Sequence, residues 1–334
     1  MRVAVLGGGR SPEHDVSLRG ASAVAEGLRA QGHEVVQVIL ALDGRWMLDG
    51  APLQLSPGGG LLGVDCVFPV LHGPGGEDGS VQGLLELLDV PYVGSGVLSS
   101  ALSLDKLAFK DSAKAAGIPQ VDYVSLSIDR WAAEPKVVAA EVERLAKPWW
   151  VKAACGGSSL GMEPVTEASE LAGAIERCLL VDHRVIVEAA ATGAEIECAV
   201  LGGPPSPTKV SDPGQIVVNT DGGWYDHEAK YTPGGMDLIV PAPLPPEVID
   251  EVRALCLRAY AHAGNHGLAR VDCFVDLEKP AGEQVLLNEI NTLPGFTATS
   301  VYSRLWAASG LGYGELLDEL LAVALARPRR LPLS

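Results

Sequence analysis

The first hundred residues alternate between strand-like and helical stretches, and this order restricts the possible folds more than any other feature of the chain. Strand-like residues 3–6 and 35–40 flank a helical stretch at residues 17–30, with a glycine turn after the first strand. A second unit of the same kind spans residues 64–94. Repeated β-α-β units place their strands in parallel and cover the sheet with helices. The sequence therefore predicts an α/β fold built on a parallel sheet.

The pattern changes near residue 100, which indicates a domain boundary. A helix at residues 102–116, a strand at residues 121–126, a helix at residues 137–145 and a pair of strands follow. A strand ending at residue 188 then runs into small residues. A length of 334 residues accommodates two or three domains. We therefore expect an N-terminal domain with a parallel sheet at residues 1–100, followed by two further domains at residues 101–188 and 189–334.

Charge and composition disfavour several classes of partner. The net charge is −17, which opposes a nucleic-acid partner because phosphate backbones need a basic face. Apolar residues make up 47% of the chain, but no run reaches the eighteen or so residues that a membrane span needs. The six cysteines form no C-x-x-C pair, so we expect reduced thiols and a cytoplasmic protein. Any anionic ligand must then be held by a few focused positive groups.

Two strand-like stretches near the C-terminus carry polar residues two positions apart. Arg270 and Asp272 share one face of the first stretch, because side chains alternate along a strand. Glu289 and Asn291 share one face of the second. If the strands pair as a hairpin, one surface carries a guanidinium, two carboxylates and an amide. Hard oxygen ligands beside an arginine suit Mg²⁺ that holds a polyphosphate.

Two common nucleotide-binding motifs are absent from the sequence. Gly7, Gly8 and Gly9 follow the first strand, but Pro12 stands where the dinucleotide fingerprint needs a glycine. This residue opposes a nicotinamide-dependent dehydrogenase. The sequence contains no Gly-Lys pair, so it also lacks the P-loop motif of many kinases and GTPases.

A glycine- and serine-rich segment at residues 155–161 is a better candidate for a phosphate loop. It follows Lys152 between two short strands and offers backbone N–H groups and the hydroxyls of Ser158 and Ser159. Lys152 and Lys106 lie within or beside apolar stretches, where a lysine that approaches a phosphate as a point charge is expected. A flexible hairpin turn would have the same composition, so the surrounding motifs decide between the two.

Seven segments carry a family resemblance when they are taken in order. They are GGRSPEHDVS (8–17), HGPGGEDG (72–79), LDK (104–106), GSSLG (157–161), YDHEAKY (225–231), ARVD (269–272) and NEINTLPGFT (288–297). Together they resemble the D-alanine:D-alanine ligases of the ATP-grasp superfamily over nearly the whole chain. The resemblance implies a three-domain ATP-grasp fold, in which a Rossmann-like parallel sheet precedes two α+β domains that clasp ATP.

The resemblance implies an ATP site between the central and C-terminal domains. The residues implied on its phosphates are Lys106, Lys152, Ser158, Ser159 and Lys230. Glu188 would contact the adenine and Glu195 the ribose. Two Mg²⁺ or Mn²⁺ ions would be held by Asp272, Glu289 and Asn291. The independent analysis of the two polar strands points to the same metal ligands.

The resemblance also implies the reaction, which supplies a peptidoglycan precursor. The carboxylate of one D-alanine attacks the γ-phosphate of ATP, and the amine of a second D-alanine then displaces phosphate through a tetrahedral intermediate. The implied substrate contacts are Glu13 and His72 for the first ammonium, Arg270 and the N–H of Gly295 for the oxyanion, and Ser300 for the second carboxylate. Ser158 and Tyr231 would close a lid through hydrogen bonds with Glu13 and exclude water.

The chain departs from the family pattern at two positions, and other functions on the same fold stay open. Ala153 and Ala189 stand where the family commonly has proline and lysine, and the second change removes one contact to the base. A D-alanine:D-lactate ligase and a non-catalytic nucleotide-binding protein are the alternatives. Relatives that form depsipeptides lack the equivalent of Tyr231, so its presence favours two D-alanines. By analogy with the family we expect a homodimer.

Overall fold

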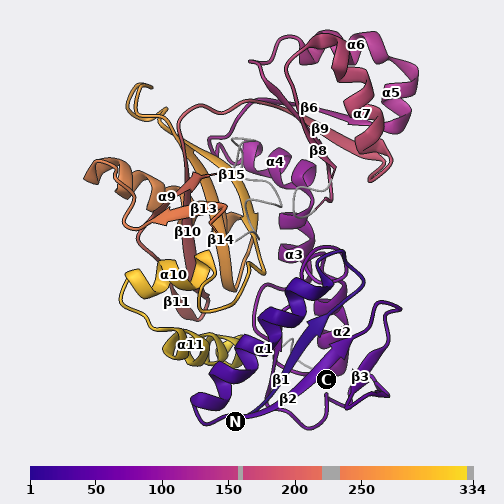
Figure 1. Ribbon diagram of the computed structural model, residues 1–334, viewed down its shortest axis with the longest axis vertical. Coiled ribbons are helices and arrows are strands. Elements are labelled where there is room, and N and C mark those ends of the chain that lie inside the picture. The colour runs from indigo at the N-terminus through magenta and orange to yellow at the C-terminus, as the bar shows by residue number, and fades with distance from the viewer. Residues whose placement is uncertain (157–160, 220–233, 329–334) are drawn as a thin grey trace.

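The computed structural model describes residues 1–156, 161–219 and 234–328. Strands in these ranges form three sheets, which succeed one another along the chain (Figure 1). Across the same ranges, no helix is long and apolar enough to cross a membrane. The architecture is mixed α/β, as the alternation of strands and helices predicts.

The first sheet has a parallel centre. Its strands are β1 (Arg2–Gly8), β2 (Glu34–Leu40), β3 (Trp46–Leu48), β4 (Ala51–Pro52) and β5 (Cys66–Pro69), in the order β4-β3-β2-β1-β5. β1 pairs in parallel with β2 and β5, whereas β3 and β4 extend one edge in antiparallel pairs. Helices α1 (His14–Ala30) and α2 (Ser80–Leu88) belong to the same part of the chain as this sheet. The strand expected at residues 92–94 is wrong, because Tyr92 makes only an isolated bridge to Val67 in the described structure.

The second sheet is antiparallel throughout. Its strands are β6 (Tyr123–Ser127), β7 (Trp149–Ala153), β8 (Met162–Val165) and β9 (Arg184–Ala189), in the order β6-β9-β7-β8. Its helices are α5 (Ile128–Ala133), α6 (Pro135–Val142), η1 (Ala168–Glu170) and α7 (Leu171–Leu179). The sequence predicts a helix at residues 137–145, whereas α6 starts at Pro135 and ends at Val142. The fixed φ of Pro135 suits the first turn of a helix.

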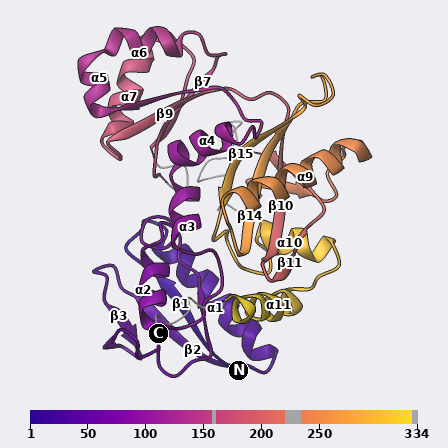
Figure 2. The same cartoon turned by 180° about the vertical axis from the view of Figure 1, so that it is seen from behind.

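Two helices lead from the first sheet to the second. Figure 2 shows α3 (Val97–Leu104) rising from the N-terminal part towards α4 (Lys106–Ala115). The sequence predicts one helix at residues 102–116, but the chain breaks at Asp105. This residue has extended backbone angles, and its carboxylate accepts a hydrogen bond from the N–H of Ala108 at 3.1 Å. Asp105 thus caps α4 and ends α3.

The third sheet contains the predicted hairpin. Its strands are β10 (Ala194–Gly203), β11 (Ser206–Val210), β12 (Gly214–Val218), β13 (Met236–Ile239), β14 (Gly267–Val275) and β15 (Val285–Asn291). The order is β13-β12-β10-β14-β15, and β11 pairs with β10. Its helices are α9 (Pro246–His262), α10 (Val301–Ala308) and α11 (Tyr313–Ala326). β14 and β15 pair antiparallel, which confirms the hairpin.

The first and third parts of the chain share one hydrophobic core. Val24 and Leu28 of α1 belong to the same buried cluster as Leu317 and Leu321 of α11. The second sheet packs with α6 and α7 around a cluster of its own, which includes Ile175. Figure 1 shows the same division, with α11 beside α1 and the second sheet set apart.

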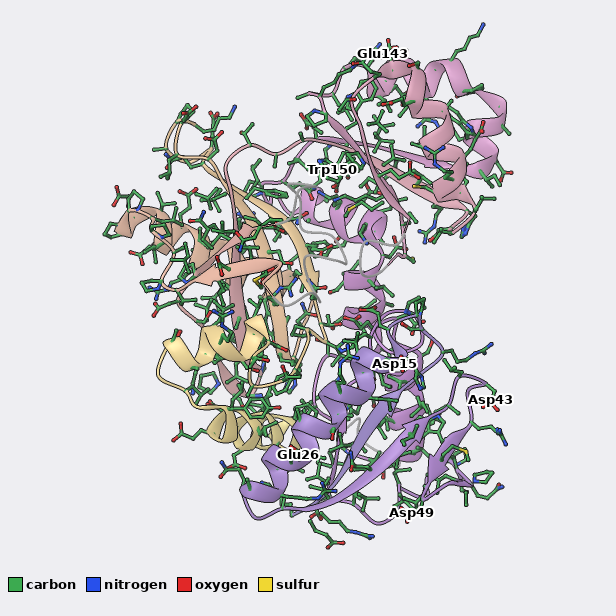
Figure 3. The ribbon with its side chains drawn as sticks, viewed as in Figure 1. Asp15, Glu26, Asp43, Asp49, Glu143 and Trp150 are labelled. Carbon is green, nitrogen blue, oxygen red and sulfur yellow. The ribbon has the colours of Figure 1, made fainter. Side chains whose placement is uncertain are left out.

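Acidic side chains are spread over the outer surface. Asp15 and Glu26 of α1, Asp43 and Glu143 are all exposed, and Figure 3 shows them well separated. Trp150 of β7 instead lies between the second and third sheets in this view. These four carboxylates therefore lie away from the space between the second and third sheets.

Candidate active site

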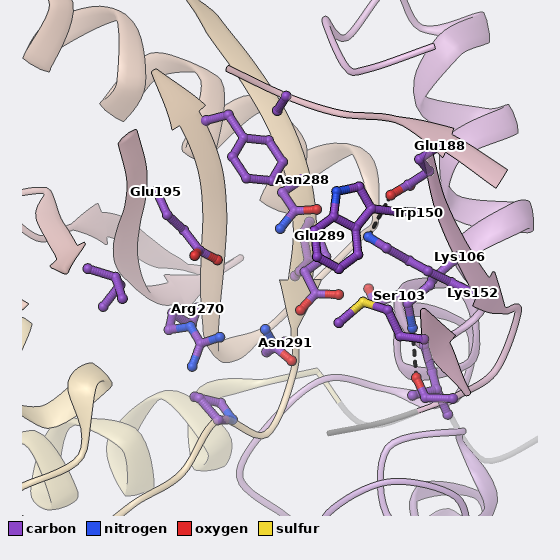
Figure 4. Close-up of a pocket in the computed structure, with 18 of the residues that line it drawn as sticks. Ser103, Lys106, Trp150, Lys152, Glu188, Glu195, Arg270, Asn288, Glu289 and Asn291 are labelled. Carbon is purple, nitrogen blue, oxygen red and sulfur yellow. Dashed lines mark hydrogen bonds and ion pairs between the residues drawn. The ribbon is translucent and has the colours of Figure 1, made fainter. Parts of the chain in front are cut away.

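A cavity of about 540 Å³ opens between the second and third sheets, and loops of the N-terminal part close one end. β7 and β9 supply one wall, and β10, β14 and β15 supply the other. The predicted site residues that line it are Glu13, His72, Lys106, Lys152, Glu188, Glu195, Arg270, Glu289, Asn291 and Gly295. Figure 4 shows Lys106 and Lys152, together with Glu188, on one side of this cavity, and Glu195, Glu289 and Arg270 on the other.

The third sheet explains why polar residues gather at one place. Along one face of β10, Glu195 lies beside the cavity, whereas Ala199 and Leu201 belong to the core shared with α1 and α11. β14 follows the same course, with Leu268 in that core and Arg270 at the cavity. One face of the sheet is therefore apolar at one end and polar at the other.

The register of the hairpin brings the predicted metal ligands together. Asp272 is opposite Glu289, and Arg270 is opposite Asn291. Arg270 donates two hydrogen bonds to Asp272, at 2.7 Å from Nε and 2.6 Å from Nη2. Asn291 donates a further one to Asp272 at 3.1 Å. The prediction that both strand faces form a single polar surface is confirmed.

The sequence analysis missed Glu197, which completes this cluster. Glu197 is fully buried and is opposite Asp272 on β10. Its carboxylate forms an ion pair with Nε of Arg270 at 3.0 Å. The signal was available, because Glu195 and Glu197 are two positions apart in an apolar strand, the same spacing as Arg270 and Asp272.

Two lysines line the opposite wall of the cavity, and a third, Lys110, lies behind it. Lys152 is 2.5 Å from one oxygen of Glu188, and Lys110 is 2.9 Å from the other. Burial alone would raise the pKa of Glu188, but the two lysines lower it to about 2. Lys106 donates a hydrogen bond to the carbonyl of Gly156 at 2.7 Å, and burial lowers its pKa. Lys110 was missed by the sequence analysis, although it lies one helical turn after Lys106.

The N-terminal loops meet the third part of the chain at Leu293. The His72 ring donates a hydrogen bond from Nδ1 to the carbonyl of Leu293 at 3.0 Å. Glu77 accepts one from the N–H of Leu293 at 3.3 Å and one from the N–H of Gly73 at 2.7 Å. Burial lowers the pKa of His72 and raises that of Glu77 to about 8. Both loops also contribute to the cavity, where Glu13 lies beside His72 and Glu77.

The remaining predicted residues fall into two groups. Ser300 precedes α10, and its hydroxyl accepts a hydrogen bond from the N–H of Thr297 at 3.0 Å. A Cβ atom on Gly295 would lie 3.4 Å from this hydroxyl, so the two residues are neighbours although Ser300 does not line the cavity. The second group lies outside the described residues and comprises Ser158, Ser159, Lys230 and Tyr231.

The donor set on the hairpin fits Mg²⁺ or Mn²⁺ better than a softer metal. In the described ranges, no group of three or more His, Cys, Asp and Glu side chains is arranged to hold an ion alone. Asp272, Glu289 and Asn291 supply two carboxylates and an amide, and Arg270 already bonds to Asp272. Such a set suits a hard ion that takes its other ligands from water and substrate phosphates.

The second and third sheets face each other across the cavity, with Lys106 and Lys152 on one wall and Glu289 on the other. This arrangement defines an ATP-grasp enzyme. Comparison with known proteins identifies the family. The family model for the D-ala D-ala ligase C-terminus matches residues 113–322, and that for the N-terminus matches residues 2–60 and 54–95. The chain belongs to the D-alanine–D-alanine ligase family.

Individual relatives match over almost their full length. A D-alanine–D-alanine ligase of Kineococcus radiotolerans is 42% identical over 98% of this chain and 97% of its own. One of Thermoanaerobacter pseudethanolicus is 39% identical over 97% and 96%. The solved D-alanine–D-alanine ligase of Coxiella burnetii has a TM-score of 0.84 at 34% identity, covering 97% of this chain and 94% of its own. The VanG D-Ala:D-Ser ligase of Enterococcus faecalis has the same TM-score at 31% identity, covering 97% and 99%.

Proposed function

We propose that the protein joins two D-alanines to D-alanyl-D-alanine with cleavage of ATP to ADP and phosphate, and so supplies a peptidoglycan precursor. The observation that carries the proposal is the division of charge across the cavity. Lys106 and Lys152 on one wall suit a polyphosphate, and Glu289 and Asn291 on the other suit the metal ions that accompany it. Membership of the ligase family supports the same reaction.

ATP would lie between the two walls. Glu188 and Glu195 would contact the adenine and the ribose, and Lys106, Lys152, Ser158, Ser159 and Lys230 would contact the phosphates. Two Mg²⁺ or Mn²⁺ ions, held by Asp272, Glu289 and Asn291, would neutralise phosphate charge and orient the phosphates. The lysines reduce the negative charge that the first D-alanine carboxylate meets as it attacks the γ-phosphate.

The amino-acid substrates would bind at the end of the cavity that the N-terminal loops close. Glu13 and His72 would hold the ammonium of the first D-alanine beside the γ-phosphate. Attack by its carboxylate gives D-alanyl phosphate and ADP. The amine of the second D-alanine then adds to the carbonyl carbon, and phosphate leaves as the amide forms. Arg270 and the N–H of Gly295 would stabilise the tetrahedral oxyanion.

The second D-alanine is selected by groups around its carboxylate and by the lid. Ser300 would bind the carboxylate. Tyr231, together with Ser158 and Glu13, would close the lid and keep water from the acyl phosphate. Because the similar VanG structure is described as a D-Ala:D-Ser ligase, the fold alone does not choose the second substrate. Tyr231 carries our choice of D-alanine over D-lactate.

The reaction is tested by phosphate release from ATP with Mg²⁺ and with D-alanine alone, L-alanine alone, or D-alanine plus D-lactate or D-serine. Mass spectrometry identifies the product. We expect D-alanyl-D-alanine as the main product at pH 6 and at pH 8. Mainly D-alanyl-D-lactate in the D-lactate mixture at both values would contradict the substrate assignment. An absence of phosphate release from every mixture would contradict the enzymatic function.

We also propose that the protein is a cytoplasmic homodimer. The described cysteines are all free thiols, which suits a reducing compartment. The dimer rests on analogy with the family. Sedimentation velocity at micromolar concentration tests it, and a monomer mass would contradict it.

A further inference from the structure

The net charge of the chain is −17, which opposes the binding of an anionic nucleotide. Lys152 is the lysine nearest to Glu188, and the two form a close ion pair. A pair of opposite unit charges has little field at a distance, so this pair alone offers little attraction to a phosphate. The residue that follows Glu188 on this wall, Ala189, adds no charge, so Lys106 is the other cation that lines the wall among the described residues.

Lys110 changes the net charge of this group of side chains, although it lies behind the cavity wall. It is 2% exposed, lies outside the cavity lining, and approaches the Glu188 oxygen that Lys152 does not use. Glu188 is therefore held between two ammonium groups, and the three side chains together carry one net positive charge. Lys152 lines the cavity, so the excess charge faces the space where phosphates would bind.

Helix α4 places Lys110 by its periodicity. Lys106, Lys110 and Lys114 are each four residues apart, so they follow one face of the helix. Lys106 contacts Gly156 at the start of the phosphate loop, and Lys110 contacts Glu188. Lys114 is exposed and lies 5.4 Å from the centre of the Tyr123 ring, which Lys110 also approaches at 5.7 Å.

We propose that Lys110 is a positioning residue for the nucleotide: it neutralises Glu188, so that the positive charge of Lys152 is available to the phosphates. This inference rests on the proposed binding of ATP. Lys110 itself touches no ligand and acts through Glu188 and Lys152. Replacing it by methionine keeps the bulk of the side chain and removes the charge.

The test compares the binding of ADP and of uncharged adenosine in the presence of Mg²⁺, by calorimetry with displacement for the weaker ligand. We expect Lys110→Met to weaken ADP binding by about ten- to a hundredfold, the scale for one charge lost close to an anion in a partly buried site. Adenosine binding should change by less than about threefold, because it carries no phosphate. The matched control Lys114→Met, which removes a lysine above the same ring, should change neither value.

Two further variants separate this role from support of the fold. Lys110→Arg keeps the charge and should restore most of the ADP affinity. The double variant Lys110→Met with Glu188→Gln removes both charges, so its ratio of ADP to adenosine affinity should recover towards the native value. The double variant also serves if Lys110→Met alone fails to fold, because it leaves no unpaired buried carboxylate.

Several outcomes would overturn the proposal. They are an ADP affinity of Lys110→Met within about threefold of native, an equal loss for ADP and adenosine, and a double variant with no recovery of the ratio. If the native protein ligates D-alanine but Lys110→Met has the native ratio of ADP to adenosine affinity, the role of Lys110 is wrong and the proposed function stands. A native protein that binds no ADP would overturn the proposed function as well.

Discussion

Arg270 bonds to two buried carboxylates, Glu197 at 3.0 Å and Asp272 at 2.6 Å and 2.7 Å. These bonds fix the plane of the guanidinium at the edge of the cavity. Loss of one partner from a buried ion pair costs roughly 3–5 kcal/mol of folding free energy, because a carboxylate is left uncompensated. Arg270 is therefore expected to serve both the fold and the oxyanion.

Replacement of Arg270 should separate these two contributions. We expect Arg270→Met to lower kcat by roughly 10² to 10³, the scale for losing one oxyanion donor, and to lower the melting temperature. Arg270→Lys keeps the charge but loses the planar fork, so it should recover stability more than rate. Steady-state kinetics and thermal unfolding measure both. If Arg270→Met lowers kcat by less than about fivefold, the oxyanion role is wrong.

At the scale of elements, Glu77 joins two loops that are more than two hundred residues apart in the chain. Its carboxylate accepts hydrogen bonds from the N–H of Gly73 in its own loop and from the N–H of Leu293 in the loop after β15. The His72 ring donates a hydrogen bond to the carbonyl of the same Leu293. The loop that supplies Gly295 is thus tied to the loop that supplies His72. This contact holds the two loops in one arrangement at the end of the cavity where we propose that the amino-acid substrates bind.

Glu77 should also give the stability a recognisable pH dependence. Its pKa rises from 4.5 to about 8 on folding, chiefly through burial. Between these values the folded state holds a proton that the unfolded state has lost, so this contribution to stability decreases as pH rises. Glu77→Gln removes it, and the native-minus-variant difference in melting temperature should decline from pH 5 to pH 8. A difference that is constant over this range would contradict the assignment.

The sequence predicted these elements to different degrees. The two-residue period of Arg270 and Asp272, and of Glu289 and Asn291, was enough for the hairpin, because strand alternation is local. The break at Asp105 was missed, since a capping side chain overrode an unbroken helical pattern. Lys110 and Glu197 were missed for a different reason. Lys110 of α4 pairs with Glu188 of β9, and Glu197 of β10 pairs with Arg270 of β14. The spacing of Glu195 and Glu197 indicates a polar strand face, but only the folded chain shows which partner each residue meets.

At the scale of the molecule, the cavity lies between parts with different supports. The first and third parts share a core that includes Leu28 and Leu321, whereas the second has its own around Ile175. A perturbation of the shared core should therefore reach both the first and the third sheet. One in the separate core should remain in the second sheet.

Hydrogen exchange of two core variants tests this division. Leu321→Ala and Ile175→Ala each remove a fully buried side chain, and each should cost roughly 2–5 kcal/mol. We expect Leu321→Ala to increase amide exchange in both β1 and β14. Ile175→Ala should increase it in β7 and β9 and spare the other sheets. Faster exchange confined to the third sheet in Leu321→Ala would show that the shared core does not couple the two parts.

The packing of α11 on α1 also has a consequence for biosynthesis. A ribosome completes α1 about three hundred residues before it makes α11, so the part of α1 that contacts α11 has no partner during most of translation. Val24 and Leu28 of the nascent chain are therefore incompletely covered until α11 has been made. The core is completed when α11 leaves the exit tunnel, and holdase chaperones have a binding surface until that moment.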